Sequence, residues 1–205
     1  MSVLRTLLVS LVLVAAGIGV LAEVTDGFRA YTTETARRIR VREHPRAVPP
    51  LPLQTASGAR TDFGALRGRW LLVDFIYTRC TTYCSVQGSE FARLQDELAG
   101  PIAAGKVTLL SVSFDPGRDD PAALARYQRL HGARGNGWIA ARPVDAADLT
   151  ELMDVFGVVA VPDGLGGFVH NAAIAVVDPW GRLVGIMDWD DSRGAVRYVT
   201  RRLSP

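Results

Sequence analysis

The segment WLLVDFIYTRCTTYC, residues 70–84, gives the first indication of how this chain folds. Its first eight residues are apolar except for Asp74, a pattern typical of a strand buried at the centre of a sheet. The only two cysteines of the chain, Cys80 and Cys84, follow directly. From about Cys84 to Leu98 the apolar spacing predicts a helix. The cysteines are therefore expected between a buried strand and the first turn of a helix.

The rest of the chain alternates between predicted strands and helices. Further strands are expected at residues 107–114, 168–178 and 182–187. Further helices are expected at residues 121–130, 145–156 and 191–203. Cysteines between the first long strand and the first long helix are typical of the thioredoxin arrangement. We therefore expect an α/β, thioredoxin-like fold, a central mixed sheet with flanking helices, preceded by an N-terminal membrane segment.

The N-terminal part of the chain differs in composition from the rest. Residues 7–22, LLVSLVLVAAGIGVLA, fit either a membrane anchor or a signal segment, and the lack of a clean Ala-x-Ala site favours the anchor. Residues 23–50 are polar and charged and end in a proline-rich stretch, as a spacer would. The predicted organisation is a transmembrane anchor or signal segment at residues 1–22, a spacer at 23–50 and a thioredoxin-like domain at 51–205.

The charge balance argues against one class of partner. The chain has 23 basic and 21 acidic residues, a net charge of +2. A nucleic-acid-binding protein normally shows a clear basic excess or a basic stripe, and this sequence shows neither in its main body. We therefore expect no nucleic-acid partner. Basic residues stand on both sides of the apolar segment, so charge counting alone does not orient it in a membrane.

The spacing of the cysteines allows two kinds of chemistry. At positions i and i+4 of a helical turn, the β carbons of Cys80 and Cys84 would lie about 5 to 6 Å apart. A disulfide needs β carbons about 3.5 to 4.5 Å apart, so it would require some adjustment of the loop. Two thiolates can instead converge on one metal ion. Both outcomes remain open, and the pair can be a disulfide in one state and a ligand set in another.

A third ligand has to come from elsewhere in the chain. Structural zinc sites need four protein ligands, whereas two thiolates with one imidazole suit copper, especially Cu(I). Of the three histidines, His44 lies in the spacer and His131 at the end of a predicted helix. His170 begins a predicted strand, at the position that faces the cysteine loop in a thioredoxin fold. We therefore predict Cys80, Cys84 and His170 as metal ligands.

The loop DPGRDDP, residues 115–121, is expected at the same end of the sheet because it follows the second buried strand. Asp115 has two interpretations. It either orients a ligand or stabilises a cationic metal site, or it simply begins a turn that Asp119 caps.

These residues resemble the SCO/SenC family, copper-binding thioredoxin-fold proteins that assist the assembly of cytochrome c oxidase. The similarity covers about residues 52–203 and rests on VDFIYTRCTTYC, VSFDPGRDDPAALARYQ and VHNAAIAVVDPWGRLVG. By this resemblance, Cys80, Cys84 and His170 match the family's copper ligands. The implied role is delivery of copper, as Cu(I) or Cu(II), to the Cu(A) centre of oxidase subunit II, or to another exported copper protein.

Two other functions remain open at this point. The chain is either a non-enzymatic copper metallochaperone, which we favour, or a thiol-disulfide oxidoreductase that reduces the cysteines of the oxidase subunit. A copper or redox sensor is the third possibility. Thiolate ligands must be kept reduced, and the periplasm is oxidising, so a thioredoxin-like reductant is an expected partner. We expect a single-pass protein of the inner membrane whose domain faces the periplasm.

Overall fold

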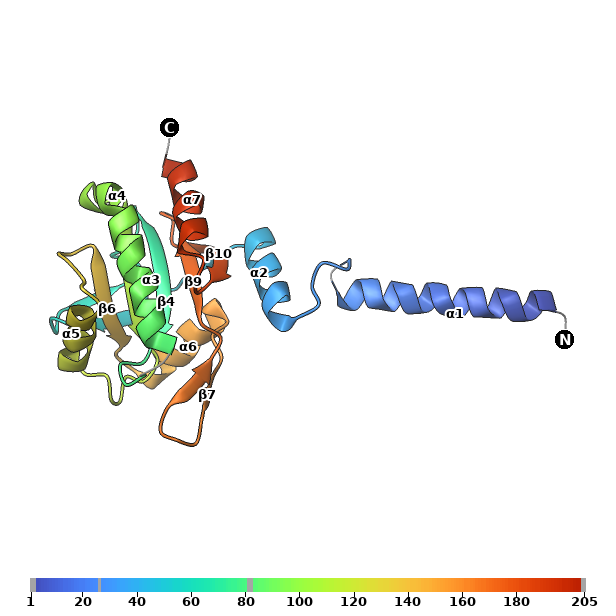
Figure 1. Ribbon diagram of the computed structural model, residues 1–205, viewed down its shortest axis with the longest axis horizontal. Coiled ribbons are helices and arrows are strands. Elements are labelled where there is room, and N and C mark those ends of the chain that lie inside the picture. Colours follow the sequence, from blue (N-terminus) through green and yellow to red (C-terminus); the bar gives the residue numbers. More distant parts are fainter. Residues whose placement is uncertain (1–2, 26, 81–82, 204–205) are drawn as a thin grey trace. The chain divides into compact units, whose positions relative to one another are not determined.

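The structure, a computed structural model shown in Figure 1, describes residues 3–25, 27–80 and 83–203, with the backbone alone at 83–86. The chain divides into two compact units, residues 1–43 and 44–205. The second unit begins a few residues before the predicted domain start at residue 51, since its first strand already pairs at residue 46.

The first unit consists of two helices. Helix α1 (Val3–Val24) has 22 residues, carries no acidic residue in its first turn and is long and apolar enough to cross a membrane. At 1.5 Å per residue it would extend about 33 Å, close to the thickness of a bilayer's hydrocarbon core. It fits the single-pass anchor predicted from the sequence. Helix α2 (Thr33–Glu43) is polar, and Glu34 in its first turn pairs with Arg37 and Arg38.

The second unit is built on a mixed sheet. In the described part of the chain this sheet has eight strands, in the order β1-β10-β9-β4-β5-β6-β2-β3, and β7 pairs with β8 in a separate hairpin. Strands β4, β5 and β6 run parallel to one another, while β9 pairs antiparallel with β4. The strands are β1 (Arg46–Ala47), β2 (Pro52–Thr55), β3 (Arg60–Asp62), β4 (Trp70–Ile76), β5 (Val107–Ser113), β6 (Trp138–Pro143), β7 (Ala160–Pro162), β8 (Phe168–His170), β9 (Ala173–Val177) and β10 (Arg182–Asp188).

Helices cover both faces of this sheet. They are α3 (Tyr83–Glu97), α4 (Ala99–Ala103), α5 (Pro121–Leu130), α6 (Ala146–Phe156) and α7 (Ser192–Leu203). Helices α3 and α7 pack side by side on one face (Figure 1). Successive side chains of a strand point to opposite faces. In β4, Leu72 and Ile76 accordingly pack with Phe91 of α3, while Phe75 contacts Phe156 of α6 with ring centroids 5.1 Å apart.

The architecture confirms the predicted thioredoxin-like fold, although several short elements, among them β1, β7 and α4, were not predicted. Strand β6, at the position between β5 and β2, was not expected from the sequence. The strand predicted at 168–178 is interrupted at residues 171 and 172. The side chain of Asn171 explains the break, because it accepts a hydrogen bond from the Val159 N–H at 2.7 Å and donates one to the Gly157 carbonyl at 3.0 Å. These bonds hold Asn171 outside the hydrogen-bonded ladder of the eight-stranded sheet. They separate β8, which carries His170, from β9.

Candidate metal centre

The cysteine loop begins where β4 ends, at the carboxyl edge of the parallel strands, and a buried carboxylate holds its first part. Asp119, which is fully buried, lies in the loop that follows β5. It accepts hydrogen bonds from the Thr78 N–H at 3.0 Å and the Thr78 hydroxyl at 2.6 Å. The hydroxyl of Ser113 donates a third, at 2.6 Å. The loops after β4 and β5 are thus joined two residues before Cys80.

Arg79 makes a second connection, from the cysteine loop to two other segments. One of its guanidinium nitrogens lies 3.1 Å from the Asp115 carboxylate and 3.1 Å from the Gly166 carbonyl oxygen. Asp115 begins a turn, as one of its two interpretations has it, while a role beside the metal site stays a prediction. Its carbonyl begins a turn by accepting from the N–H groups of Arg118 and Asp119, while its side chain pairs with Arg79, the residue before Cys80. Asp119, by contrast, does not cap that turn with its side chain but bonds across to the cysteine loop.

The hairpin β7–β8 brings His170 to the same region. In the hairpin, Phe168 and His170 are cross-strand partners of Pro162 and Ala160. The Tyr77 hydroxyl lies 3.3 Å from the Phe168 N–H, which donates to it, and 3.4 Å from the Phe168 carbonyl, to which it donates. Tyr77 stands three residues before Cys80, so these bonds fasten the hairpin to the cysteine loop.

Four rings pack against one another at this junction. Tyr77, Phe114 and Phe168 lie with their ring centroids 5.3 to 5.4 Å apart in each pair. The imidazole of His170 packs on Phe114 at 5.1 Å. His170 is half-buried, and burial lowers its pKa below the usual value for histidine. A lower pKa favours the neutral imidazole, which is the form that binds metal ions.

The four predicted site residues are placed by these elements to different degrees. Cys80 is half-buried, and its N–H donates to the Tyr77 carbonyl at 3.3 Å. Cys84 is the second residue of α3, and its side chain lies outside the described residues. Among the side chains that the structure does describe, no three of histidine, cysteine, aspartate or glutamate lie close enough to hold a metal ion. The ligand set Cys80, Cys84 and His170 therefore stays a prediction, and the structure brings together the segments that carry it.

Comparison with known proteins now adds to this geometry. The family model described as SCO1/SenC matches residues 40–204, well over half of the chain. The chain belongs to the SCO1/SenC family.

Individual relatives agree with this assignment. The SCO1/SenC chain is 25% identical over 139 residues to the SCO1 protein homolog of Bacillus subtilis, which covers 67% of this chain and 71% of that one. Among solved structures, it is similar to Bradyrhizobium japonicum ScoI with copper bound, at 25% identity and a TM-score of 0.64, covering 76% and 98% of the two chains. A SCO1/SenC family lipoprotein from Bacillus anthracis shares the fold, with 20% identity, a TM-score of 0.69 and coverage of 77% and 96%.

A buried carboxyl lies in β4 of this SCO1/SenC protein, on the same face of the sheet as α3. Asp74 is fully buried, and burial raises the pKa of its carboxyl to about 8. The Ser111 hydroxyl, in register on β5, lowers that pKa somewhat, although no described group makes a hydrogen bond of ordinary geometry to either oxygen. Asp74 is therefore largely protonated at neutral pH. The sequence showed it only as an interruption in an apolar run.

The other two histidines have different surroundings. His44 is exposed at the start of the second unit. His131 caps the C-terminus of α5, as predicted, but its ring also packs on Tyr127 at 4.6 Å and lies against Gly88 of α3. Burial lowers the pKa of His131. It lines a pocket that also includes Cys80, which its place at a helix end did not suggest.

Sequence reasoning did not single out Tyr77 or Arg79, and it gave Asp119 only the role of capping a turn, although all three hold the site's segments together. Asp119 lies 41 positions from Thr78, and Arg79 lies 87 from Gly166. The only available signal is topological: the loops after parallel neighbouring strands meet at one edge of a sheet.

Proposed function

We propose that this protein is a copper metallochaperone that binds copper through Cys80, Cys84 and His170. Its cargo would be delivered to the Cu(A) centre in subunit II of cytochrome c oxidase. The observation that carries this proposal is the attachment of the hairpin with His170 to the cysteine loop, through the Tyr77 hydroxyl and the Arg79 guanidinium. Family membership and the copper bound to the related ScoI support copper as the metal.

The donor types fit this cargo. Two thiolates and an imidazole form a soft ligand set that suits copper and leaves a structural zinc ion short of one ligand. A site with three protein ligands also leaves room for an incoming ligand. Copper would then leave by exchange, in which cysteine sulfurs of the partner replace Cys80 and Cys84 one at a time. The protein itself is unchanged at the end, so no substrate is chemically consumed.

The compartment follows from the same chemistry. Helix α1 would hold the protein in the inner membrane as a single-pass anchor, with residues 44–205 in the periplasm. Because that compartment is oxidising, a thioredoxin-like partner would keep the cysteines reduced. Alkaline phosphatase fused after residue 50 should be active in cells, and an inactive fusion would contradict this orientation.

Copper binding by matched histidine variants tests the proposal. Reduced protein should bind one copper ion per chain, and His170→Ala should weaken that binding at least 10-fold, within the range seen when metal-site groups are lost. The exposed His44 provides the control, since His44→Ala should bind as the wild type does. Unchanged affinity in His170→Ala would remove the three-ligand model.

A thiol-disulfide reductase is the second candidate, and the partial exposure of Cys80 favours it. Cys80 is half-buried and borders a pocket, so a sulfur of another protein can reach it. His170→Ala should leave a disulfide between Cys80 and Cys84 able to form. If that variant still supports oxidase assembly in cells while losing copper, the reductase becomes the better description.

A further inference from the structure

A pocket of about 420 Å³ lies beside Cys80 and is distinct from the hairpin that carries His170. One wall is the cysteine loop, residues 77–80, and the other is α5 together with His131. Its size is at the lower end of the range for small-ligand sites and suits a few side-chain groups. His170 does not line it.

The charged side chains among the described residues that line this pocket are all positive. Arg79 and Arg126 line it, and its described lining includes no aspartate or glutamate. Arg79 shares the carboxylate of Asp115 with Arg118, so two guanidinium groups face one carboxylate there. Arg126 is exposed, and no ion pair to it occurs in the described part of the chain. Helix α5, PAALARYQRL, contains no acidic residue at all.

The remaining surfaces of the pocket are uncharged at neutral pH. Ala123 and Leu130 contribute apolar atoms, while Tyr127 and His131 contribute two stacked rings. Burial lowers the pKa of His131, so its imidazole adds hydrogen-bonding capacity rather than a permanent charge. The positive charge therefore comes from the two arginines, at opposite walls of the pocket and next to a sulfur.

We propose that this pocket binds an acidic residue of the partner protein that stands next to the partner cysteine meeting Cys80. Charge complementarity would then bring the two sulfurs together in one orientation and disfavour partners with a basic residue at that position. The inference rests on the proposed function only in taking Cys80 as the sulfur that meets the partner. It applies equally whether that sulfur then exchanges copper or exchanges a disulfide.

The test measures the charge preference of Cys80 without copper. In the full chain, purified in detergent as the Cys84→Ser variant, Cys80 is the sole thiol. The probes are three short peptides whose cysteine carries a 2-thiopyridyl disulfide and whose neighbouring residue is glutamate, glutamine or lysine. The Cys80 thiolate attacks the peptide sulfur, a new disulfide forms, and the pyridyl sulfur leaves with the electron pair as pyridine-2-thione, whose absorbance gives the rate.

The glutamate peptide should react about threefold faster than the glutamine peptide at low salt, as expected for two unit charges about 6 Å apart in water. The lysine peptide should be the slowest of the three. In 1 M salt, where the Debye length is about 3 Å, the rates should converge. Rates are compared with those of free glutathione, which corrects for the intrinsic reactivity of each peptide.

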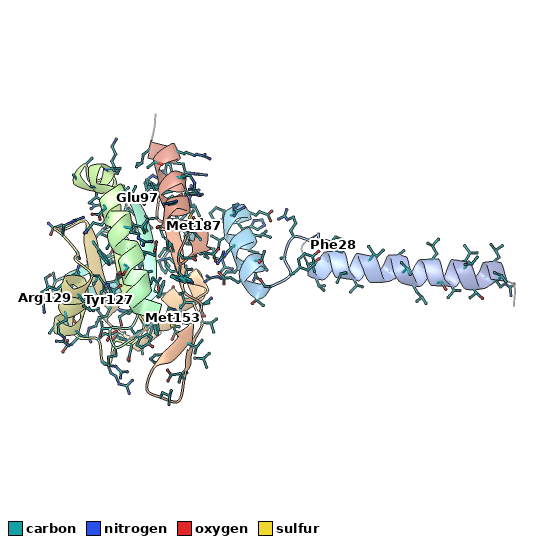
Figure 2. The ribbon with its side chains drawn as sticks, in the orientation of Figure 1. Phe28, Glu97, Tyr127, Arg129, Met153 and Met187 are labelled. Carbon is teal, nitrogen blue, oxygen red and sulfur yellow. The ribbon has the colours of Figure 1, made fainter. Side chains whose placement is uncertain are left out.

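Arg126→Glu should bring the rates of the glutamate and lysine peptides together, because the new carboxylate offsets the remaining charge of Arg79. The matched control is Arg129→Glu, because Arg129 is an exposed arginine of the same helix that does not line the pocket. Tyr127 and Arg129 point to opposite sides of α5 (Figure 2). The control should keep the wild-type order. Equal rates for all three peptides with the wild-type pocket, or equal effects of the two arginine variants, would overturn the inference. The reaction rates do not depend on copper, so they should be unchanged in His170→Ala even if that variant no longer binds copper.

Discussion

Replacing Asp74 with asparagine should remove a pH dependence from the stability of the domain. The carboxyl has a pKa of about 8 in the folded protein, against 3.8 for an unperturbed aspartate. Between these values the folded state keeps a proton that the unfolded state has lost. Unfolding then releases one proton, so the free energy of unfolding falls as the pH rises, by about 1.4 kcal/mol per pH unit. The contribution is complete below pH 3.8 and is lost as the pH rises toward 8.

Asparagine has nearly the same shape but no proton to release. From pH 5 to pH 7, wild-type stability should therefore fall by about 2.7 kcal/mol more than that of Asp74→Asn. The variant should become the relatively more stable protein as the pH rises, since it avoids the cost of keeping an acidic group buried.

Urea unfolding of residues 44–205, a unit that contains the whole sheet, can measure this difference at pH 5, 6 and 7. The four tryptophans of the chain provide a fluorescence signal. Asp190→Asn, at an exposed site, should follow the wild-type slope and serves as the control. Parallel pH profiles for wild type and Asp74→Asn would show that Asp74 is already ionised in the fold and would refute the reasoning.

Two further predictions concern the junction between the cysteine loop and the hairpin. Tyr77→Phe removes the hydroxyl that bonds the Phe168 backbone and should lower stability by about 1 kcal/mol and weaken copper binding, measured by competition with a chelator. Tyr198→Phe is the control: it loses a similar hydrogen bond, to the Val184 carbonyl, and should lower stability without changing copper binding. Equal copper affinities in the two variants would argue against a role for the junction in holding copper. Asp119→Asn weakens three hydrogen bonds to a buried carboxylate and should destabilise the domain by about 2 to 3 kcal/mol in urea unfolding, whereas a neutral effect would mean that this carboxylate does not hold the loop.

Much of the fold could be predicted from local pattern. The run at residues 70–77 is apolar because β4 is covered by helices on both faces, and the observed strand, Trp70–Ile76, is buried at every position. Strand β6 escaped notice because its pattern is less regular: Arg142 lies among its apolar residues and donates hydrogen bonds to the Gln54 side chain. The break after β8 could not be foreseen either, since it depends on bonds from Asn171 to a loop 12 to 14 positions away.

The candidate site was likewise predictable only in part. Cys80, Cys84 and His170 could be selected because thiols and imidazoles are few in this chain and have distinctive chemistry. Arginines and aspartates are numerous, so nothing in the sequence indicates that Arg79 or Asp119 holds the cysteine loop in place. Their importance depends on contacts across 36 to 87 positions, which only the arrangement of the parallel strands creates.

X-ray absorption at the copper edge of the reduced protein, loaded with one equivalent of Cu(I), examines the proposed ligands directly. The account predicts scattering from sulfur of both cysteines together with the multiple-scattering pattern of one imidazole, and loss of that pattern in His170→Ala but not in His44→Ala. A spectrum with sulfur alone, or an imidazole signal that survives in His170→Ala, would contradict it.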